Sequence, residues 1–267
     1  MVRLLHAARS DVGMTRSGNE DNFAVDVGTE RAVFMVADGM GGHAAGEVAS
    51  EMAVQIVMRE LSTVNELTSS VSRDRVGNAL RVANRSIHDR TIAENDKQGM
   101  GTTASVLLLT NTEYLIGQVG DSRVYLLRDG ALRQLTKDHS YVQEQVDAGF
   151  LTPEQARFHP YSNVITRCVG ASADVEPDVY FGEARPGDLF LIASDGLTGM
   201  VDDRRLQGLL MSRAEPERKV QALISEANGR GGLDNITAIV VQVLGDDRPT
   251  AVIEMARVPS ETSNPTP

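Results

Sequence analysis

A short apolar segment ends at a carboxylate in the first part of the chain. Residues 32–37 read Ala-Val-Phe-Met-Val-Ala, a run too short for a helix and typical of a buried strand, and Asp38 follows it directly. The next residues, Gly39-Met40-Gly41-Gly42, allow a tight turn and a close backbone approach to a ligand. From Glu47 the apolar spacing becomes helical. We therefore expect Asp38 at the tip of a core strand, facing a cleft, although Asp-Gly is also a common turn pair.

Acidic residues recur at the boundaries of four further apolar segments. They are Asp121 after residues 114–119, Asp195 after 188–194, Asp234 before 236–243, and the pair Glu20-Asp21 before 23–25. If these strand ends converge, their carboxylates form a nest of oxygens that repel one another unless cations are present. Oxygen ligands suit hard divalent ions such as Mg²⁺ or Mn²⁺ rather than Zn²⁺.

The composition narrows the class of protein. The chain has 267 residues, of which 41% are hydrophobic, and no Pro/Ser/Gly-rich linker precedes its tail, so we expect one domain. A net charge of -11 at pH 7 argues against a nucleic-acid binder. The single cysteine, Cys168, is expected to be a small buried hydrophobe. We find neither a signal peptide nor a membrane span, and expect a cytoplasmic protein without a membrane partner.

The remaining patterns predict a mixed α and β protein. Residues 62–75 are polar and predict a connection, and the spacing of Val76, Leu80, Ala83 and Ile87 predicts a second amphipathic helix. Arg128-Asp129-Gly130 between two apolar runs predicts a hairpin, which implies antiparallel sheet. We interpret residues 136–170 as a mobile flap of short helices and loop, residues 203–228 as a helix, and the tail from 245 to 267 as disordered.

Taken in order, six motifs resemble those of the metal-dependent protein phosphatase family, also called protein phosphatase 2C, in its bacterial form. The motifs are Arg16-Ser17-Gly18-Asn19-Glu20-Asp21, Val36-Ala37-Asp38-Gly39-Met40-Gly41-Gly42, Gly99-Met100-Gly101-Thr102-Thr103, Gly120-Asp121-Ser122-Arg123, Ala193-Ser194-Asp195-Gly196 and Asp234-Asn235-Ile236-Thr237. The resemblance covers residues 10–243 and implies a four-layer α-β-β-α sandwich, with two packed antiparallel sheets flanked by helices. It also implies hydrolysis of phosphoserine and phosphothreonine in proteins by a catalytic domain that spans residues 1–244.

The resemblance further implies a binuclear Mn²⁺ or Mg²⁺ centre. In it Asp38 bridges both ions, the Gly39 carbonyl helps to hold one, Asp195 and Asp234 hold the first, and Glu20 supports the second. Two such ions lower the pKa of a shared water. Asp121 with Asp195 matches a third, weaker metal site of bacterial members. Arg16 matches the family's phosphate-binding arginine, since a guanidinium can bind two phosphate oxygens at once.

Several positions keep alternative interpretations. Asp121 could be a plain hairpin residue, Glu20 a salt-bridge partner and Arg16 a structural residue. Met40 stands where eukaryotic members carry a His that is a suspected general acid, and we do not transfer that role to His43. What protonates the leaving oxygen stays open, and a metal-bound water is one candidate. Asn235 is expected to orient Asp234 or the substrate.

Two histidines of the flap segment, His139 and His159, are expected at the surface rather than as ligands. Their segment lies beside the strands that lead to Asp121 and Asp195, and we expect it to select among phosphoproteins.

Two competing function classes are weaker. A dinucleotide site at Asp38 lacks the G-x-G-x-x-G spacing, and no P-loop motif occurs. A non-catalytic relative that binds phosphoproteins as a scaffold would be signalled by loss of a metal aspartate, and every expected aspartate is present. We expect a monomeric enzyme whose protein substrates include Hanks-type Ser/Thr kinases.

Overall fold

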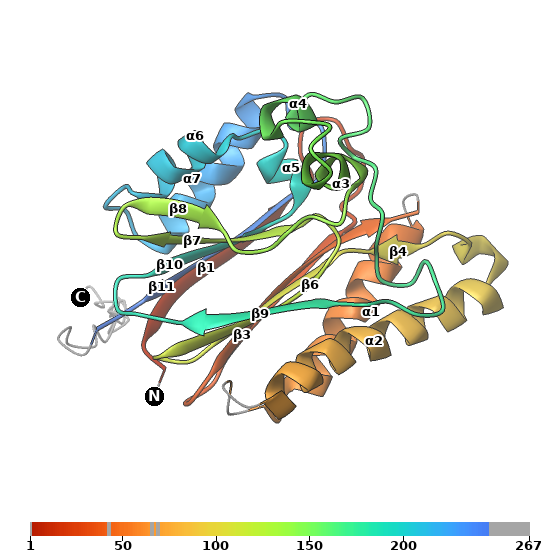
Figure 1. Cartoon of the computed structure of the whole chain (residues 1–267), viewed down its shortest axis with the longest axis horizontal. Coiled ribbons are helices and arrows are strands. Elements are labelled where there is room, and N and C mark those ends of the chain that lie inside the picture. Colours follow the sequence, from red (N-terminus) through yellow and green to blue (C-terminus); the bar gives the residue numbers. More distant parts are fainter. Residues whose placement is uncertain (1, 42–43, 65–66, 68–69, 246–267) are drawn as a thin grey trace, which may run out of the picture.

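The computed structural model describes residues 2–41, 44–64, 67 and 70–245, so the predicted tail and His43 lie outside the described residues. The described strands form two antiparallel sheets (Figure 1). The first sheet has the order β1 (Leu4–Asp11), β11 (Ile236–Val243), β10 (Leu189–Ala193), β7 (Arg123–Arg128) and β8 (Ala131–Gln134). The second has the order β2 (Asp21–Val27), β3 (Ala32–Met40), β5 (Ala104–Leu109), β6 (Glu113–Val119) and β9 (Asp178–Glu183), and β4 (Gly101–Thr102) pairs with β3.

Strand β3 shows why the apolar run before Asp38 is continuous. Phe34 and Val36 belong to the cluster between the two sheets, whereas Val33 and Met35 belong to a second cluster beneath the helices. Because side chains alternate along a strand, burial on both faces removes the usual polar alternation. The same alternation places Asp38 on the face that meets the other sheet.

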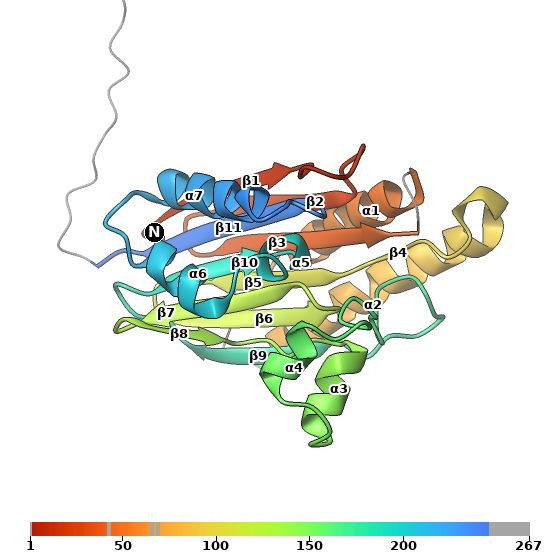
Figure 2. The same cartoon turned by 90° about the horizontal axis from the view of Figure 1, so that it is seen from above.

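Helices cover the outer face of each sheet and complete four layers (Figures 1 and 2). The helices α1 (Ala44–Leu61) and α2 (Ser70–Ala93) pack on the second sheet, and α5 (Asp195–Thr198), α6 (Asp203–Leu210) and α7 (Pro216–Gly229) pack on the first. The predicted α-β-β-α sandwich is confirmed. None of the described helices is long and apolar enough to cross a membrane.

The predicted boundaries need three corrections. The second amphipathic helix begins at Ser70, inside the predicted connection, although its predicted stripe from Val76 to Ile87 is fully buried. The predicted helix 203–228 is two helices, because α7 begins anew with Pro216 in its first turn, where proline is well tolerated. Strand β9 was not predicted.

The flap segment, residues 136–170, contains α3 (Tyr141–Asp147) and α4 (Pro153–Arg157) joined by loops, as the sequence predicts. Ser140 caps α3, and Thr152 forms a capping box with Gln155 at the start of α4. Figure 2 shows both helices projecting from the edge of the sandwich. The flap segment is therefore built from locally capped helices outside the layered body.

Candidate active site

The acidic residues come from both sheets and meet at one end of the sandwich, which we call the carboxylate end. Asp38 lies near the end of β3, and Asp21, the first residue of β2, is its cross-strand partner. Asp195 follows β10 and opens α5, while Asp234 lies two residues before β11. Asp121 lies in the connection from β6 to β7, which crosses from one sheet to the other. The strand order thus brings together carboxylates that lie more than two hundred positions apart in the sequence, as Asp21 and Asp234 do.

Burial and mutual repulsion raise the pKa values of this cluster. The pKa of Asp38 lies well above its usual range because of burial, followed by the charges of Asp21, Asp195 and Asp121. Burial, then Asp195, likewise raises the pKa of Asp121. Burial, followed by the charge of Asp234, also raises the pKa of Asp195, although its contact with the Asp38 carboxyl lowers it.

Asp21 is a member of the cluster to which the sequence analysis assigned no role. Its Oδ2 accepts hydrogen bonds from Ser194 Oγ at 2.9 Å and from Thr237 Oγ1 at 2.6 Å. Burial raises the pKa of Asp21 to about 7, although both hydrogen bonds lower it. A sequence signal exists: pairing outward from Gly28-Thr29-Glu30-Arg31 sets Asp21 opposite Asp38.

Three carboxylate oxygens of the cluster are buried without a hydrogen-bond partner among the described residues. They are Oδ1 of Asp21, of Asp121 and of Asp195. An unpartnered buried anionic oxygen is costly, and a divalent cation satisfies it. In the described part of the chain no three acidic, histidine or cysteine side chains already meet as a preformed metal site. The donor chemistry nevertheless fits hard divalent ions, and the side chains would have to rotate to enclose them.

Arg16 reaches the cluster from its rim. Its Nη2 lies 2.8 Å from Asp234 Oδ2, and about half of its side chain is exposed. Asp234, more than Glu20 and Asp38, raises the pKa of Arg16. The structure thus brings together the arginine and the acidic residues named from the sequence.

Two glycines let Glu20 approach the cluster. The Glu20 carbonyl accepts a hydrogen bond from the Gly39 N–H at 3.1 Å. A Cβ atom on Gly46, in the first turn of α1, would overlap the Glu20 carboxylate, and one on Gly39 would overlap the Gly46 carbonyl. The close contact between β3 and α1 therefore requires glycine at both positions, and it places the Glu20 side chain against the start of α1.

Asn235 holds the loop that carries Arg16 and Glu20. Its side chain accepts from the Glu20 N–H at 2.8 Å and donates to the carbonyls of Gly18 and Val12 at 2.8 and 3.0 Å. Its backbone N–H, not its side chain, donates to Asp234 Oδ1 at 2.8 Å. The Asn235 side chain thus ties the loop to β11, and only its backbone contacts Asp234.

Comparison with known proteins decides the family. Residues 15–227 match the family model described as Protein phosphatase 2C. The serine/threonine phosphatase stp of Listeria welshimeri is 37% identical over 244 residues, which cover 89% of this chain and 96% of that protein. The chain belongs to the protein phosphatase 2C family. The predicted family and enzyme class are confirmed.

Solved structures of phosphatases support the same assignment. The serine/threonine phosphatase PstP/Ppp of Mycobacterium tuberculosis is 39% identical to this phosphatase, with a TM-score of 0.81 over 92% of this chain and 100% of that chain. A structure of the PstP catalytic domain in complex with 2 manganese ions is also 39% identical, with a TM-score of 0.78 over 91% of this chain and 99% of that chain. The predicted dependence on manganese or magnesium is supported at the level of the family.

One histidine of this phosphatase was misjudged. His139 is not a surface residue, since only 6% of it is exposed. The Gly120 N–H donates to its Nδ1 at 3.0 Å, and Asp178 Oδ2 lies 3.3 Å from its Nε2. Burial, and then the charge of Arg167, lower the pKa of His139. The sequence pattern did not indicate that His139 is buried, because its partner Asp178 belongs to strand β9, which was not predicted. The other histidine, His159, is partly exposed and lies beside Tyr141 and Tyr161.

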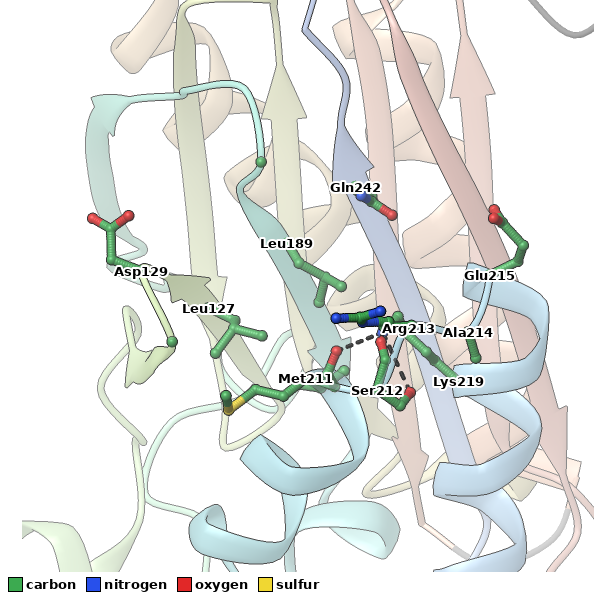
Figure 3. Close-up of a pocket in the computed structure, with 13 residues that line it drawn as sticks. Leu127, Asp129, Leu189, Met211, Ser212, Arg213, Ala214, Glu215, Lys219 and Gln242 are labelled. Atoms are coloured by element: carbon green, nitrogen blue, oxygen red, sulfur yellow. Dashed lines mark hydrogen bonds between the residues drawn. The ribbon is translucent and has the colours of Figure 1, made fainter. Parts of the chain in front are cut away.

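A pocket of this phosphatase, drawn in Figure 3, lies at the end of the first sheet that is opposite to the carboxylate end. This cavity of about 540 Å³ is lined where β7 and β11 end and β10 begins, as Leu127, Gln242 and Leu189 show. Its Lys219 ammonium is buried and donates to the carbonyls of Leu210 and Ser212, and burial lowers the pKa of Lys219. The cation therefore caps α6, and the pocket contains none of the site residues.

Proposed function

We propose that this chain hydrolyses phosphoserine and phosphothreonine in proteins at the carboxylate end. The observation that carries the proposal is the set of buried aspartates from both sheets, three of them with an unpartnered Oδ1, beside a half-exposed arginine. Such a cluster is unstable as a purely structural core, because each ionised carboxylate repels the others at short range. It is suited to a cation-assisted reaction on an anionic substrate.

The ion-holding residues follow from their places in the cluster. Asp38 projects from the second sheet toward the first and would contact both core ions, with the Gly39 carbonyl beside it. Asp195 and Asp234, from the first sheet, would hold one ion, and Glu20 would support the other. When bound, Mn²⁺ or Mg²⁺ ions supply an activated water and neutralise charge on the phosphate oxygens. The unpartnered Asp121 Oδ1, with Asp195, would hold a third and weaker ion.

Arg16 would bind the phosphate group. Its guanidinium is placed at the rim by the loop that Asn235 fastens to β11, and its ion pair with Asp234 is solvent-exposed. Exposed ion pairs contribute little stability, so exchanging the Asp234 carboxylate for phosphate oxygens is inexpensive. The planar guanidinium orients the phosphate, and it stays charged throughout because its pKa is raised.

The flap segment would select protein substrates. It exposes three aromatic side chains, Phe150, Phe158 and Tyr161, with 76%, 83% and 58% of their surfaces accessible. Exposed aromatic residues on a segment beside the active site suit protein docking. We propose that the substrates include Hanks-type Ser/Thr kinases, which rests on the family resemblance, and that a monomeric catalytic domain of residues 1–244 acts in the cytoplasm.

The test compares turnover with binding. The full chain, stripped of metal, is assayed on p-nitrophenyl phosphate and on a phosphorylated Ser/Thr kinase from the same genome, with Mn²⁺ or Mg²⁺ added and then chelated. We expect turnover that appears with the ion and disappears with the chelator. Phosphoprotein binding without turnover under every metal condition would instead support the scaffold class.

A further inference from the structure

We propose that His139 is a positioning residue that fixes the Gly120–Asp121 turn and joins it to the base of the flap segment. His139 is buried, and its two hydrogen bonds to Gly120 lie one residue away from Asp121. The expected effect of His139 on turnover rests on the proposed role of Asp121 in holding a third ion. The arrangement of its hydrogen bonds carries the inference.

His139 and Gly120 hold each other through two hydrogen bonds. The Gly120 N–H donates to His139 Nδ1 at 3.0 Å, and the His139 N–H donates to the Gly120 carbonyl at 2.9 Å. Gly120 has a φ of 101°, and a Cβ atom there would lie 2.6 Å from Thr103. The turn is therefore a left-handed glycine turn packed against Thr103, between β4 and β5, and the imidazole satisfies its buried N–H.

Asp121 depends on this turn for its orientation. The residue is 6% exposed, and its Oδ1 has no hydrogen-bond partner among the described residues. No side-chain donor therefore fixes that oxygen, and the backbone must aim it. A change in the Gly120 peptide would rotate the carboxyl of the following residue.

The second nitrogen of the imidazole, Nε2, faces Asp178 of β9 and Arg167 near the end of the flap segment. Because Nδ1 accepts a hydrogen bond, the neutral ring carries its proton on Nε2, which lies 3.3 Å from Asp178 Oδ2. Arg167 Nη1 donates to Asp178 Oδ1 at 3.0 Å and to the Glu176 carbonyl at 2.8 Å. It lies 3.1 Å from the protonated Nε2, so it is a second donor to the Asp178 carboxylate and not a partner of the ring. The imidazole thus bridges the Asp121 turn and the Arg167–Asp178 ion pair.

The backbone of His139 joins the two ends of the flap segment. Its carbonyl accepts from the Thr166 N–H at 2.8 Å, and the next residue, Ser140, caps α3 and bridges to Ile165. On the other side Asp138 accepts from Arg123 Nη2 at 2.6 Å. A displacement of the two ends of the flap segment, where His139 and Ser140 pair with Thr166 and Ile165, therefore acts on the Gly120–Asp121 turn through His139.

Two substitutions separate the contact of Nδ1 with Gly120 from the contact of Nε2 with Asp178. In His139→Asn the amide oxygen occupies the place of Nδ1 and can still accept from Gly120, while the arm to Asp178 is lost. In His139→Gln the amide reaches toward Asp178 and leaves the Gly120 N–H without an acceptor. His6→Gln is the matched control, since this exposed histidine lies in β1 and pairs with Val241, toward the end of β11 that is remote from Asp234.

The first measurement is hydrogen exchange of the Gly120 amide by NMR in the full, metal-free chain. We expect exchange roughly tenfold faster in His139→Gln, because a buried N–H without an acceptor opens readily, and a change within about twofold in His139→Asn and His6→Gln. Melting temperatures show that each variant is folded. Equal exchange in the Asn and Gln variants, whether fast or slow, would overturn the proposal.

The second measurement is a double-mutant cycle on p-nitrophenyl phosphate turnover with Asp121→Asn. If His139 acts through Asp121, His139→Gln lowers turnover in the parent chain and adds less than about a twofold further loss in the Asp121→Asn chain. Losses that multiply would contradict the proposal. Full turnover by Asp121→Asn alone would refute the proposed role of Asp121, and Gly120 exchange would then decide the role of His139.

Discussion

Replacing Asp21 by asparagine should stabilise the metal-free protein, and the gain should grow as the pH rises. In the folded chain the pKa of Asp21 is raised from 3.8 to about 7, chiefly by burial and then by Asp195 and Asp234. A raised carboxyl pKa means that the folded state binds the proton more tightly than the unfolded state does. Stability is therefore unaffected by this group below pH 3.8, falls as the pH rises, and reaches its full loss above about pH 7.

The two pKa values set the size of the effect. With the pKa of Asp21 raised from 3.8 to about 7, and ~1.4 kcal/mol for each tenfold change in proton affinity, the folded state loses about 4 kcal/mol of stability at pH 8. About 2 kcal/mol of that loss is already present at pH 5, so the advantage of the amide should grow by roughly 2 kcal/mol between the two pH values. For a chain of this size we expect a growth in melting-temperature difference of about 4–8 °C. The amide oxygen can still accept from Ser194 and Thr237.

The assay is thermal and urea unfolding of the chelator-treated full chain at pH 5 and pH 8. Asp26→Asn is the matched control, because it removes an exposed carboxylate from the same strand, and we expect no comparable growth with pH. Saturating Mn²⁺ should remove most of the advantage of Asp21→Asn, since bound cations offset the carboxylate charge. A stability difference that stays constant between the two pH values would refute the reasoning.

Four further outcomes test the site. Asp38→Asn should lower p-nitrophenyl phosphate turnover roughly a thousandfold with the fold intact by circular dichroism, because bound ions supply several kcal/mol of charge stabilisation. Arg16→Ala should weaken inhibition by free phosphate roughly 10- to 100-fold while calorimetry shows unchanged Mn²⁺ affinity. Deleting residues 150–159 should reduce phosphoprotein turnover far more than that of the small ester, and equal losses would contradict substrate selection by the flap segment. Gly46→Ala should destabilise the fold by about 1–3 kcal/mol and raise the Mn²⁺ requirement, because the methyl group displaces Glu20.

The strands that carry the site residues can be predicted from the sequence, whereas the convergence of their ends in space cannot. Strands β3, β10 and β11 are buried on both faces, so they appear as short continuous apolar runs, and the acidic residue at each boundary is directly visible. That these ends converge was implied by the family resemblance. Residue spacing alone does not specify which strands become neighbours in a sheet.

Weak patterns account for the errors. Strand β9 lies at a sheet edge, and most of its residues are half-exposed. Its Phe181 lies under the guanidinium of Arg73 rather than in the core. The alternation of apolar and polar residues that marks a strand is therefore weak in β9. Because β9 was missed, its Asp178 could not indicate that His139 is buried. The predicted helix 203–228 ignored Pro216, which begins a new helix. Asp21 could have been placed beside Asp38 from the register of the β2–β3 hairpin, which follows from its turn, but the sequence interpretation did not use that register.

The raised pKa values and the Arg16–Asp234 ion pair have one physical cause. In the metal-free chain, burial and the mutual repulsion of the carboxyl groups raise the pKa values of Asp38 and Asp195, and Arg16 supplies one positive charge at the rim. Divalent cations would neutralise the carboxylates, Asp234 included, so Arg16 would lose its main partner when the site is filled. Its guanidinium would then be available to phosphate. Because the Arg16–Asp234 ion pair is exposed and contributes little, its loss would hardly change metal affinity, whereas phosphate needs both the bound ions and the free guanidinium, which favours binding of metal before phosphoprotein.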